Sequence, residues 1–261
     1  TLDRSSAASD VYKRQAFEQA GADVNLVPFV TLNQAAIEQS VDIMVDNIKE
    51  ANIIFFAGGF SAADEPDGSA KFIVNILLNE KVRSAIDSFI EKGGLLIGIC
   101  NGFQALVKSG LLPYGNFAEA DDTSPTLFYN DANQHVAKMV ETRIANTNSP
   151  WLAGVHVGDV HAIAVSHGEG KFIVTPEEFA VLRDNGQIFS QYVDGNGQPS
   201  MDSKYNPNGS MNAIEGITSR NGQIIGKMGH SERWEDGLFQ NIPGNKDQKL
   251  FESAVRYFTG K

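Results

Sequence analysis

Cysteine is almost absent from this chain of 261 residues, which contains a single one, Cys100. One cysteine excludes an internal disulfide and any metal site built from several cysteines, and it favours a reducing compartment. No apolar run approaches the roughly 18 residues of a membrane span, and no secretory signal opens the chain. We therefore expect a cytoplasmic protein that has no membrane partner.

Basic residues are also scarce, since 21 lysines and arginines stand against 32 aspartates and glutamates, for a net charge of −11. Nucleic acids are bound through Lys and Arg, so this balance argues against a nucleic-acid partner. The chain has no Walker-type glycine-rich lysine loop and no Rossmann fingerprint, which predicts that it has no nucleotide site. Asp64, Glu65 and Asp67 have the composition of a metal cluster, but a short loop proves no coordination geometry, and we expect no metal site.

Strand-like and helical segments alternate along the early part of the chain. With 42% hydrophobic residues, the chain can bury a full core, and its length fits one large domain. The alternation predicts an α/β fold with a doubly wound, mostly parallel sheet flanked by helices. Expected strands are 24–28, 53–56, 95–99, 161–165, 188–192 and 223–227; expected helices are 12–21, 40–51, 70–93 (broken near Asn79-Glu80), 102–109, 176–184 and 246–257.

The first 15 residues fit this fold poorly. Residues 12–21 are patterned as a helix that leads into 24–28, so a doubly wound sheet needs a buried strand before them. Residues 1–9 are instead small and polar, with Leu2 as their only large apolar side chain, and 5–15 resemble translated adapter sequence. We expect residues 1–15 to be a non-native or disordered lead-in, the first strand to be missing or replaced, and the domain to span 16–261.

The single cysteine lies in the string Gly98-Ile99-Cys100-Asn101-Gly102, directly after an apolar run. Glycines allow a tight turn between a strand and a helix, and the helix N-terminus favours the thiolate over the thiol. Enzymes with α/β folds place nucleophiles in such turns. The string therefore predicts a catalytic cysteine, and the alternative is a small buried core residue.

A histidine and a glutamate two residues apart follow the strand-like run 223–227. In extended chain such residues point to the same side, so Glu232 can orient the imidazole of His230 while His230 serves Cys100 as base and then acid. Taken alone, a pair of this kind is more often a coincidence on the surface. The same caution applies to Gly58-Gly59 after 53–56, which can expose backbone N–H groups to an oxyanion or form an ordinary turn.

All three motifs follow predicted strands, and the loops after parallel strands gather at one edge of the sheet. The string 98–104, GICNGFQ, resembles the nucleophile elbow of class I, triad-type glutamine amidotransferases. Within that family the chain is similar, from about Ala16 onward, to the glutaminase domains of phosphoribosylformylglycinamidine synthase. The similar strings are 58–61 (GGFS), 64–72 (DEPDGSAKF), 166–170 (SHGEG), 206–210 (NPNGS) and 230–233 (HSER).

The resemblance implies a role for each matching residue. Cys100 would attack the carboxamide of glutamine, His230 would be the general acid and base, and Glu232 would orient it. The backbone N–H groups of Gly59 and Asn101 would form the oxyanion hole. The residues expected to bind the substrate are Gly58, Gln104, Ser166, His167, Gly168 and Glu169.

Two positions depart from the family pattern, which usually has proline at Ser231 and before the paired glycines, at Ala57. Neither change removes a catalytic group. The remaining histidines, His135, His156 and His161, match no catalytic position and are expected to be surface or structural residues.

The resemblance also implies a flavodoxin-like sheet, L-glutamine as substrate and a synthetase domain or subunit as partner. That partner would use ATP and Mg²⁺, outside this chain, to convert formylglycinamide ribonucleotide to its amidine, and no cofactor is expected in this domain. The stretch 64–69 is more similar to the large synthase, whose C-terminal part is the glutaminase. Two alternatives remain, another cysteine hydrolase of the same superfamily and a catalytically silent docking domain.

Overall fold

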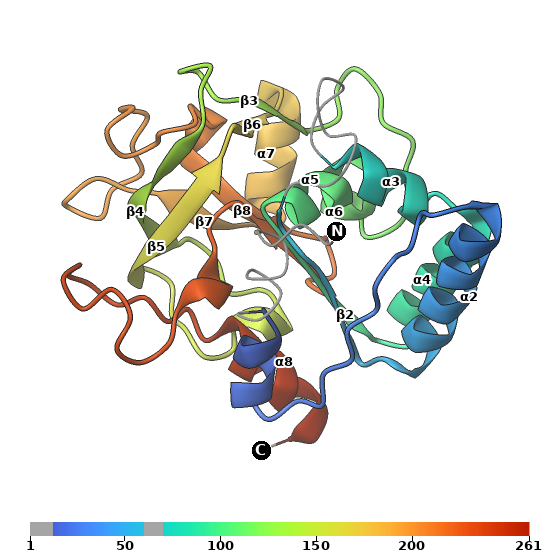
Figure 1. Cartoon of the computed structure of the whole chain (residues 1–261). Coiled ribbons are helices and arrows are strands. Elements are labelled where there is room, and N and C mark those ends of the chain that lie inside the picture. The colour runs from blue at the N-terminus through green and yellow to red at the C-terminus, as the bar shows by residue number, and fades with distance from the viewer. Residues whose placement is uncertain (1–12, 60–69, 261) are drawn as a thin grey trace.

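A seven-stranded mixed sheet runs through the molecule in a computed structural model that describes residues 13–59 and 70–260 (Figure 1). The strand order is β1-β2-β9-β8-β7-β4-β5, and β3 and β6 form a separate antiparallel pair. The strands are β1 (Ile53–Phe56), β2 (Leu95–Ile99), β3 (Thr126–Tyr129), β4 (Val136–Ile144), β5 (Val160–His167), β6 (Glu169–Ile173), β7 (Ile188–Tyr192), β8 (Ile214–Thr218) and β9 (Ile224–Lys227).

Parallel pairing is confined to β1, β2 and β9, and the other neighbours in the sheet pair antiparallel. The α/β class with helices flanking the sheet is confirmed. All five residues of β2 are buried, as expected for a strand covered on both faces. The parallel strands bring their carboxyl ends to one edge, where the three predicted motifs follow them.

The helices fall largely where the hydrophobic periodicity places them. The predicted break near Asn79 is confirmed, because its side chain caps α4 by accepting the N–H of Lys81 at 3.1 Å. Asn33 caps α2 in the same way, so that helix begins at Gln34 rather than at Ser40. The helices are α2 (Gln34–Glu50), α3 (Lys71–Leu77), α4 (Glu80–Glu91), α5 (Asn101–Lys108), α6 (Leu111–Tyr114), α7 (Pro176–Asp184) and α8 (Leu250–Thr259), with short 3-10 turns η1 (Pro150–Leu152), η2 (Met211–Ala213) and η3 (Ser231–Arg233).

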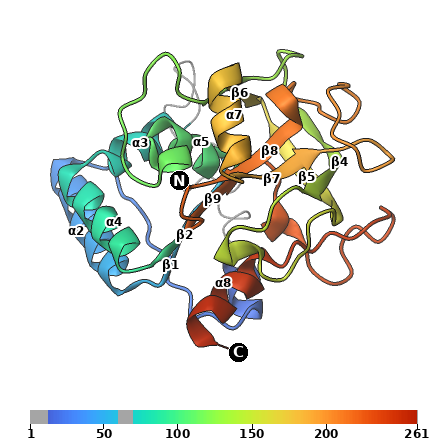
Figure 2. The same cartoon turned by 180° about the vertical axis from the view of Figure 1, so that it is seen from behind.

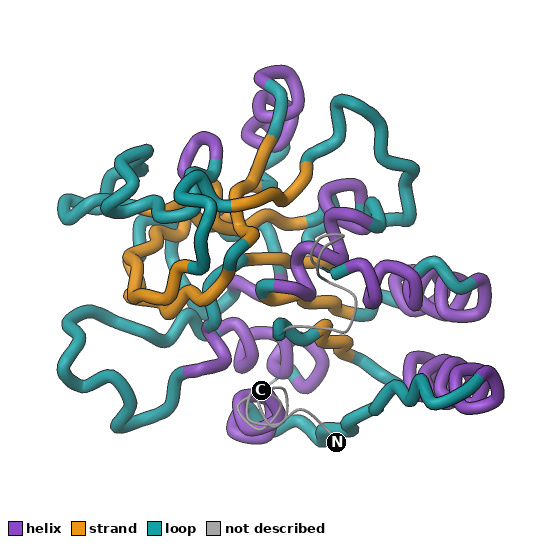
Figure 3. Tube along the Cα trace, turned by 45° about the horizontal axis from the view of Figure 1, so that its top comes forward, coloured by secondary structure: helices purple, strands orange, loops and turns teal. Residues whose placement is uncertain are grey.

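Helices cover both faces of the parallel strands (Figures 2 and 3). On one face α5 packs closely on β2, because a Cβ at Gly98 would meet the backbone of Gly102. On the other face, the ring of Phe55 lies 5.9 Å from that of Phe17, in the helical residues 13–19, and 6.4 Å from that of Phe251 in α8. These two layers hold the carboxyl ends of the strands in place.

The strand predicted at residues 24–28 is wrong, since residues 22–31 have no regular secondary structure. A strand needs a neighbour for its backbone hydrogen bonds. β1 is the outermost strand in the described part of the chain, and residues 24–28 do not pair with it. Residues 1–12 of the predicted lead-in lie outside the described residues, so the boundary at residue 15 stays a prediction.

Four strands, β3, β4, β6 and β8, were not predicted from the sequence. They belong to the antiparallel part of the molecule, where half-exposed strands such as β4 carry charged residues and lack a continuous apolar run. None of the helices formed by the described residues is long and apolar enough to cross a membrane.

Candidate active site

Cys100 occupies a sharp turn between β2 and α5. Its backbone angles are φ 56° and ψ −110°, in a region that residues with a side chain rarely adopt. The carbonyl of Lys227 at the end of β9 accepts the N–H of Cys100 at 2.8 Å, and the carbonyl of Cys100 accepts the N–H of Gln104 at 3.0 Å. The turn is therefore held from both sides, with the thiol at the start of α5, where the helix dipole favours negative charge.

His230 and Glu232 form a buried pair just beyond β9. The Nδ1 of His230 lies 2.7 Å from Oε1 of Glu232, and both side chains are almost completely buried. The N–H of His230 donates to the carbonyl of Ala164 at 2.8 Å, which ties this segment to β5. With Nδ1 committed to the carboxylate, Nε2 is left for a proton transfer.

The charges around His230 favour its protonated form. Burial opposes that charge, but the carboxylate of Glu232 and the sulfur of Cys100 outweigh burial and raise the pKa of His230 to about 9. The imidazolium in turn holds the pKa of Glu232 below its usual value despite complete burial. The arrangement thus places an imidazolium beside the sulfur of Cys100 at neutral pH, as in other cysteine–histidine nucleophile pairs.

Gly58 brings the loop after β1 against the thiol and the imidazole. A Cβ at this position would lie 2.8 Å from the carbonyl oxygen of Ile99, 2.9 Å from Cβ of Cys100 and 3.3 Å from Cε1 of His230. A side chain cannot be accommodated there without moving the backbone of the turn. The glycine is therefore required by close packing between the three loops.

We expect Gly58→Ala to lower kcat for the reaction in which Cys100 is the nucleophile about 10²-fold, because displacing reacting groups by about 1 Å costs that much. The matched control is Gly195→Ala, where a Cβ would meet no atom of the described residues within 4 Å. Steady-state kinetics on both variants, with thermal denaturation to confirm folding, test this. A folded Gly58→Ala variant with wild-type kcat would show that the close packing does not matter.

The two predicted oxyanion residues lie next to each other. The side chain of Asn101 donates to the carbonyl of Gly59 at 2.8 Å, and Gly59 has a φ of +134°, which favours glycine. This bond ties the loop after β1 to the first turn of α5. The direction of the two backbone N–H groups toward a substrate stays a prediction, and Phe60, Ser61 and 64–69 lie outside the described residues.

The junction between β5 and β6, Ser166 to Glu169, here called the substrate loop, closes the other side of the site. The carbonyl of Ser166 lies 3.8 Å from the sulfur of Cys100, and Gln104 donates through Nε2 to the carbonyl of Glu169 at 2.5 Å. Nε2 of His135 lies 3.1 Å from Oγ of Ser166, so this histidine contacts the predicted substrate loop. Gln104 and the loop, far apart in sequence, are therefore brought together as predicted.

Asn130 is a positioning residue that sequence reasoning missed. Its amide nitrogen donates to the carbonyls of His167 (2.8 Å) and Gln134 (3.1 Å), and its backbone N–H donates to the carbonyl of Gly168 (3.0 Å). Its Oδ1 lies 3.2 Å from Nδ1 of His167 and fixes the tautomer with a proton on Nδ1. The sequence gives no signal for this role, because His167 and Gly168 are distant from Asn130 in the chain.

The imidazole ring of His167 is buried and packs against the backbone of Gly170. Burial, with smaller contributions from the charges of His230 and His135, lowers the pKa of His167 to about 4. The ring is therefore neutral at neutral pH. Its fixed, buried position supports the backbone of the loop.

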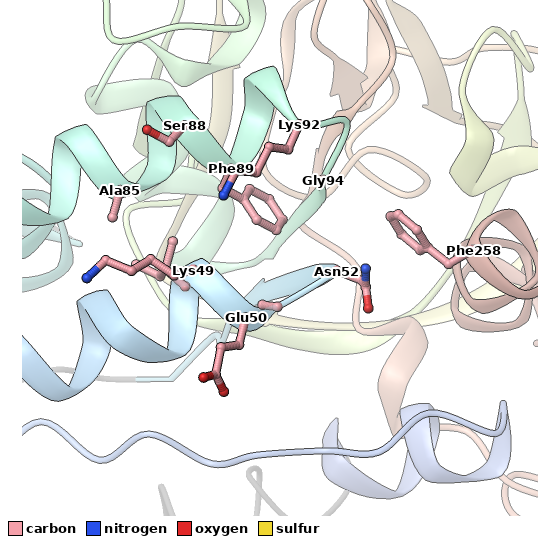
Figure 4. Close-up of a pocket in the computed structure, with 11 residues that line it drawn as sticks. Lys49, Glu50, Asn52, Ala85, Ser88, Phe89, Lys92, Gly94 and Phe258 are labelled. Atoms are coloured by element: carbon pink, nitrogen blue, oxygen red, sulfur yellow. The ribbon is translucent and has the colours of Figure 1, made fainter.

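A separate pocket of about 200 Å³ lies at the opposite end of the strands (Figure 4). It is lined by Asn52 before β1, Gly94 before β2 and Phe258 of α8. Cys100 follows the carboxyl end of β2, whereas this pocket lies at the amino ends of β1 and β2. None of the predicted site residues lines it.

A cysteine in a strained strand–helix turn, beside a buried histidine–glutamate pair on an α/β sheet, defines a class of enzymes with a cysteine–histidine–glutamate triad. The chain belongs to the family of CobB/CobQ-like glutamine amidotransferase domains, whose pattern it matches over residues 7–258. It is therefore an enzyme of the glutamine amidotransferase type.

Curated relatives match most of this chain. It is 31% identical over 229 residues to phosphoribosylformylglycinamidine synthase subunit PurQ of Gloeobacter violaceus, covering 87% of this chain and 90% of that one. It is 35% identical over 190 residues to PurQ of Acaryochloris marina, covering 73% of each chain.

Solved structures support the fold. PurLQS from Thermotoga maritima superposes with a TM-score of 0.65 at 23% identity, over 95% of this chain and 92% of that one. The glutaminase domain of Trypanosoma brucei CTPS superposes with a TM-score of 0.55 at 13% identity, over 100% and 92% of the two chains. The predicted fold class is confirmed by these structures.

Proposed function

We propose that this chain is the glutaminase component of phosphoribosylformylglycinamidine synthase, which hydrolyses L-glutamine to glutamate and ammonia for purine biosynthesis. The observation that carries the proposal is the packing of Cys100, His230 and Gly58 at the carboxyl ends of β2, β9 and β1. The PurQ relatives, which belong to this synthase by name, support the choice of reaction.

In the proposed mechanism, the thiolate of Cys100 attacks the carboxamide carbon of glutamine. The backbone N–H groups of Gly59 and Asn101 stabilise the oxyanion. The imidazolium of His230 gives its proton to the leaving nitrogen, so that ammonia departs and a γ-glutamyl thioester remains. Water, deprotonated by His230, then attacks the thioester, and glutamate and the thiolate are released while Glu232 keeps the imidazole oriented.

Substrate binding is assigned to the residues around this centre. The backbone of Gly58 lies against the reacting groups, and Gln104 is held by the loop that it faces. The α-amino and α-carboxylate groups of glutamine would be bound by that loop, formed by Ser166, His167, Gly168 and Glu169. Because the ring of His167 is buried, its contribution is through the backbone.

The ammonia would be used by a synthetase domain or subunit that binds ATP and Mg²⁺ outside this chain. We propose no cofactor for this domain, because thiolate chemistry requires none. The relatives are named as separate subunits, whereas the stretch 64–69 favours fusion to the C-terminus of a large synthase. A reducing cytoplasm suits the single reactive cysteine.

Labelling with a diazoketone analogue of glutamine tests the proposal. Since Cys100 is the only cysteine, we expect one adduct by intact-protein mass spectrometry, located on Cys100. Excess glutamine should slow the labelling, whereas excess asparagine should not. Labelling that glutamine does not slow would indicate another cysteine hydrolase, and absence of labelling would indicate a silent docking domain.

A further inference from the structure

A lysine lies fully buried directly behind the histidine–glutamate pair. Lys227 is the last residue of β9, and its side chain is 0% exposed. An ammonium group that is removed from water must be compensated by acceptors or by an opposite charge. The contacts of Lys227 therefore indicate what this unusual burial stabilises.

Three acceptors surround the ammonium group, one for each of its protons. Nζ of Lys227 lies 2.8 Å from Oγ of Ser231, 2.6 Å from Oε1 of Gln248 and 3.5 Å from Oε1 of Glu215. The hydroxyl of Ser231 also donates to Oε1 of Gln248 at 2.6 Å. All four side chains are buried, so water does not compete for these bonds.

The network is attached to the segment that carries His230 and Glu232. Glu215 accepts the N–H of Gly229 at 2.7 Å, and Ser231 lies between the two members of the pair. Lys227, Gly229 and Ser231 thus take part in the hydrogen bonds around the buried ammonium group, whereas His230 and Glu232 contact each other. The carbonyl of Lys227 also accepts the N–H of Cys100 at 2.8 Å, which links the network to the nucleophile.

The charges around Lys227 also support the carboxylate of Glu232. The charged and titratable groups that face Lys227 are Glu215 from β8, Glu232 from η3 and His161 from β5. Burial lowers the pKa of Lys227, and the carboxylates of Glu215 and Glu232 act against that effect. Within the described part of the chain, the second oxygen of Glu232 has no hydrogen-bond partner, and the ammonium adds to the positive charges of His230 and Arg233 that stabilise this carboxylate.

We propose that Lys227 and Glu215 form a positioning pair for catalysis, which fixes residues 229–231 and supports the carboxylate that orients His230. Neither side chain touches the reacting atoms, and both act through Gly229, Ser231 and Glu232. The effect on turnover rests on the proposed glutaminase function, whereas the effect on the His230–Glu232 hydrogen bond does not.

The central test is Lys227→Met combined with Glu215→Gln in the full chain. Replacing both partners leaves no unpaired buried charge, so the double variant should fold with a Tm within about 5 °C of wild type. We expect kcat for glutamine hydrolysis to fall about tenfold, with KM changed less than about twofold, because orientation is lost while substrate contacts remain. The control is Lys249→Met, at a lysine that is 41% exposed.

A second measurement reports the hydrogen bond between His230 and Glu232 directly. In the proton NMR spectrum, the hydrogen-bonded Nδ1–H of His230 should give a far-downfield resonance in wild type and in Lys249→Met. We expect this resonance to broaden or shift in the double variant. Ser231→Ala, which keeps both charges and removes one hydroxyl, should weaken the resonance and lower kcat about threefold to tenfold.

The outcomes separate the two proposals. A folded double variant with wild-type kcat and an unchanged resonance overturns the positioning role. If the double variant fails to fold, an unchanged resonance and kcat in Ser231→Ala overturn it instead. If wild type does not hydrolyse glutamine but the resonance still depends on Lys227 and Glu215, the glutaminase function fails and the positioning role stands.

Discussion

Replacing Cys100 by alanine is expected to lower glutamine hydrolysis by at least about 10⁴-fold, because the reaction then has no nucleophile. No other cysteine can substitute for it. Removing one buried sulfur costs little packing, so the variant should remain folded. The measurement is ammonia release under saturating glutamine, together with thermal denaturation.

The control for Cys100→Ala is Ser109→Ala, at the opposite end of α5. Ser109 is also buried, and its hydroxyl donates to the carbonyl of Leu106 at 3.2 Å. This variant should keep its activity within about twofold, since a change at the far end of α5 affects stability rather than the geometry of the site. A folded Cys100→Ala protein that retains more than about a hundredth of wild-type activity would exclude the thioester mechanism.

Replacing Glu232 by glutamine is expected to lower kcat at neutral pH by about 10⁴-fold, the effect that follows from removing the orienting carboxylate of a triad. The shape of the side chain is retained, but its charge is lost. Burial then acts on His230 without Glu232 to oppose it, so the pKa of His230 falls from about 9. Since the imidazolium protonates the leaving ammonia, the alkaline limb of the pH profile should move toward acid.

The free energy of unfolding should also depend on pH through the protonation of His230. In the folded protein His230 has a pKa of about 9, above the ordinary histidine value of 6.5. Its pairing therefore stabilises the fold fully below about pH 6.5, and this stabilisation is lost as the pH rises through about 9. The difference in unfolding free energy between wild type and Glu232→Gln should accordingly shrink across that range, as measured by urea denaturation.

Glu252→Gln is the matched control for this series. Glu252 is 52% exposed and pairs with Lys249, and exposed pairs contribute little to stability. Its pH profile and unfolding free energy should follow those of wild type. A Glu232→Gln variant with an unshifted alkaline limb would mean that Glu232 does not control the protonation of His230.

Much of the candidate site could be predicted from the sequence because its motifs are local. The glycines around Cys100, the spacing of His230 and Glu232, and the glycine pair at Gly58 each describe one turn after one strand. Parallel strands bring such turns to one edge whatever the rest of the fold does. For the same reason, the regular helices and the parallel strands β1, β2 and β9 were predicted well.

The errors occurred where pairing partners decide the structure. Residues 24–28 have the composition of a strand but no neighbour with which to form one, and the sequence pattern does not report neighbours. The strands β4 and β8 were missed for the opposite reason, since antiparallel neighbours hold them in place without a strong local signal.

By itself, the sequence determined the kind of chemistry: a lone cysteine in an elbow, an acid–base pair and a family pattern of glutamine amidotransferases. Only the tertiary structure decided how that chemistry is supported. Asn130 reaches the loop at 166–169, and Lys227 with Glu215 reaches Gly229 and Ser231, through hydrogen bonds between segments distant in sequence. Such polar side chains are buried only when the folded chain supplies their partners, and a linear pattern does not contain those partners.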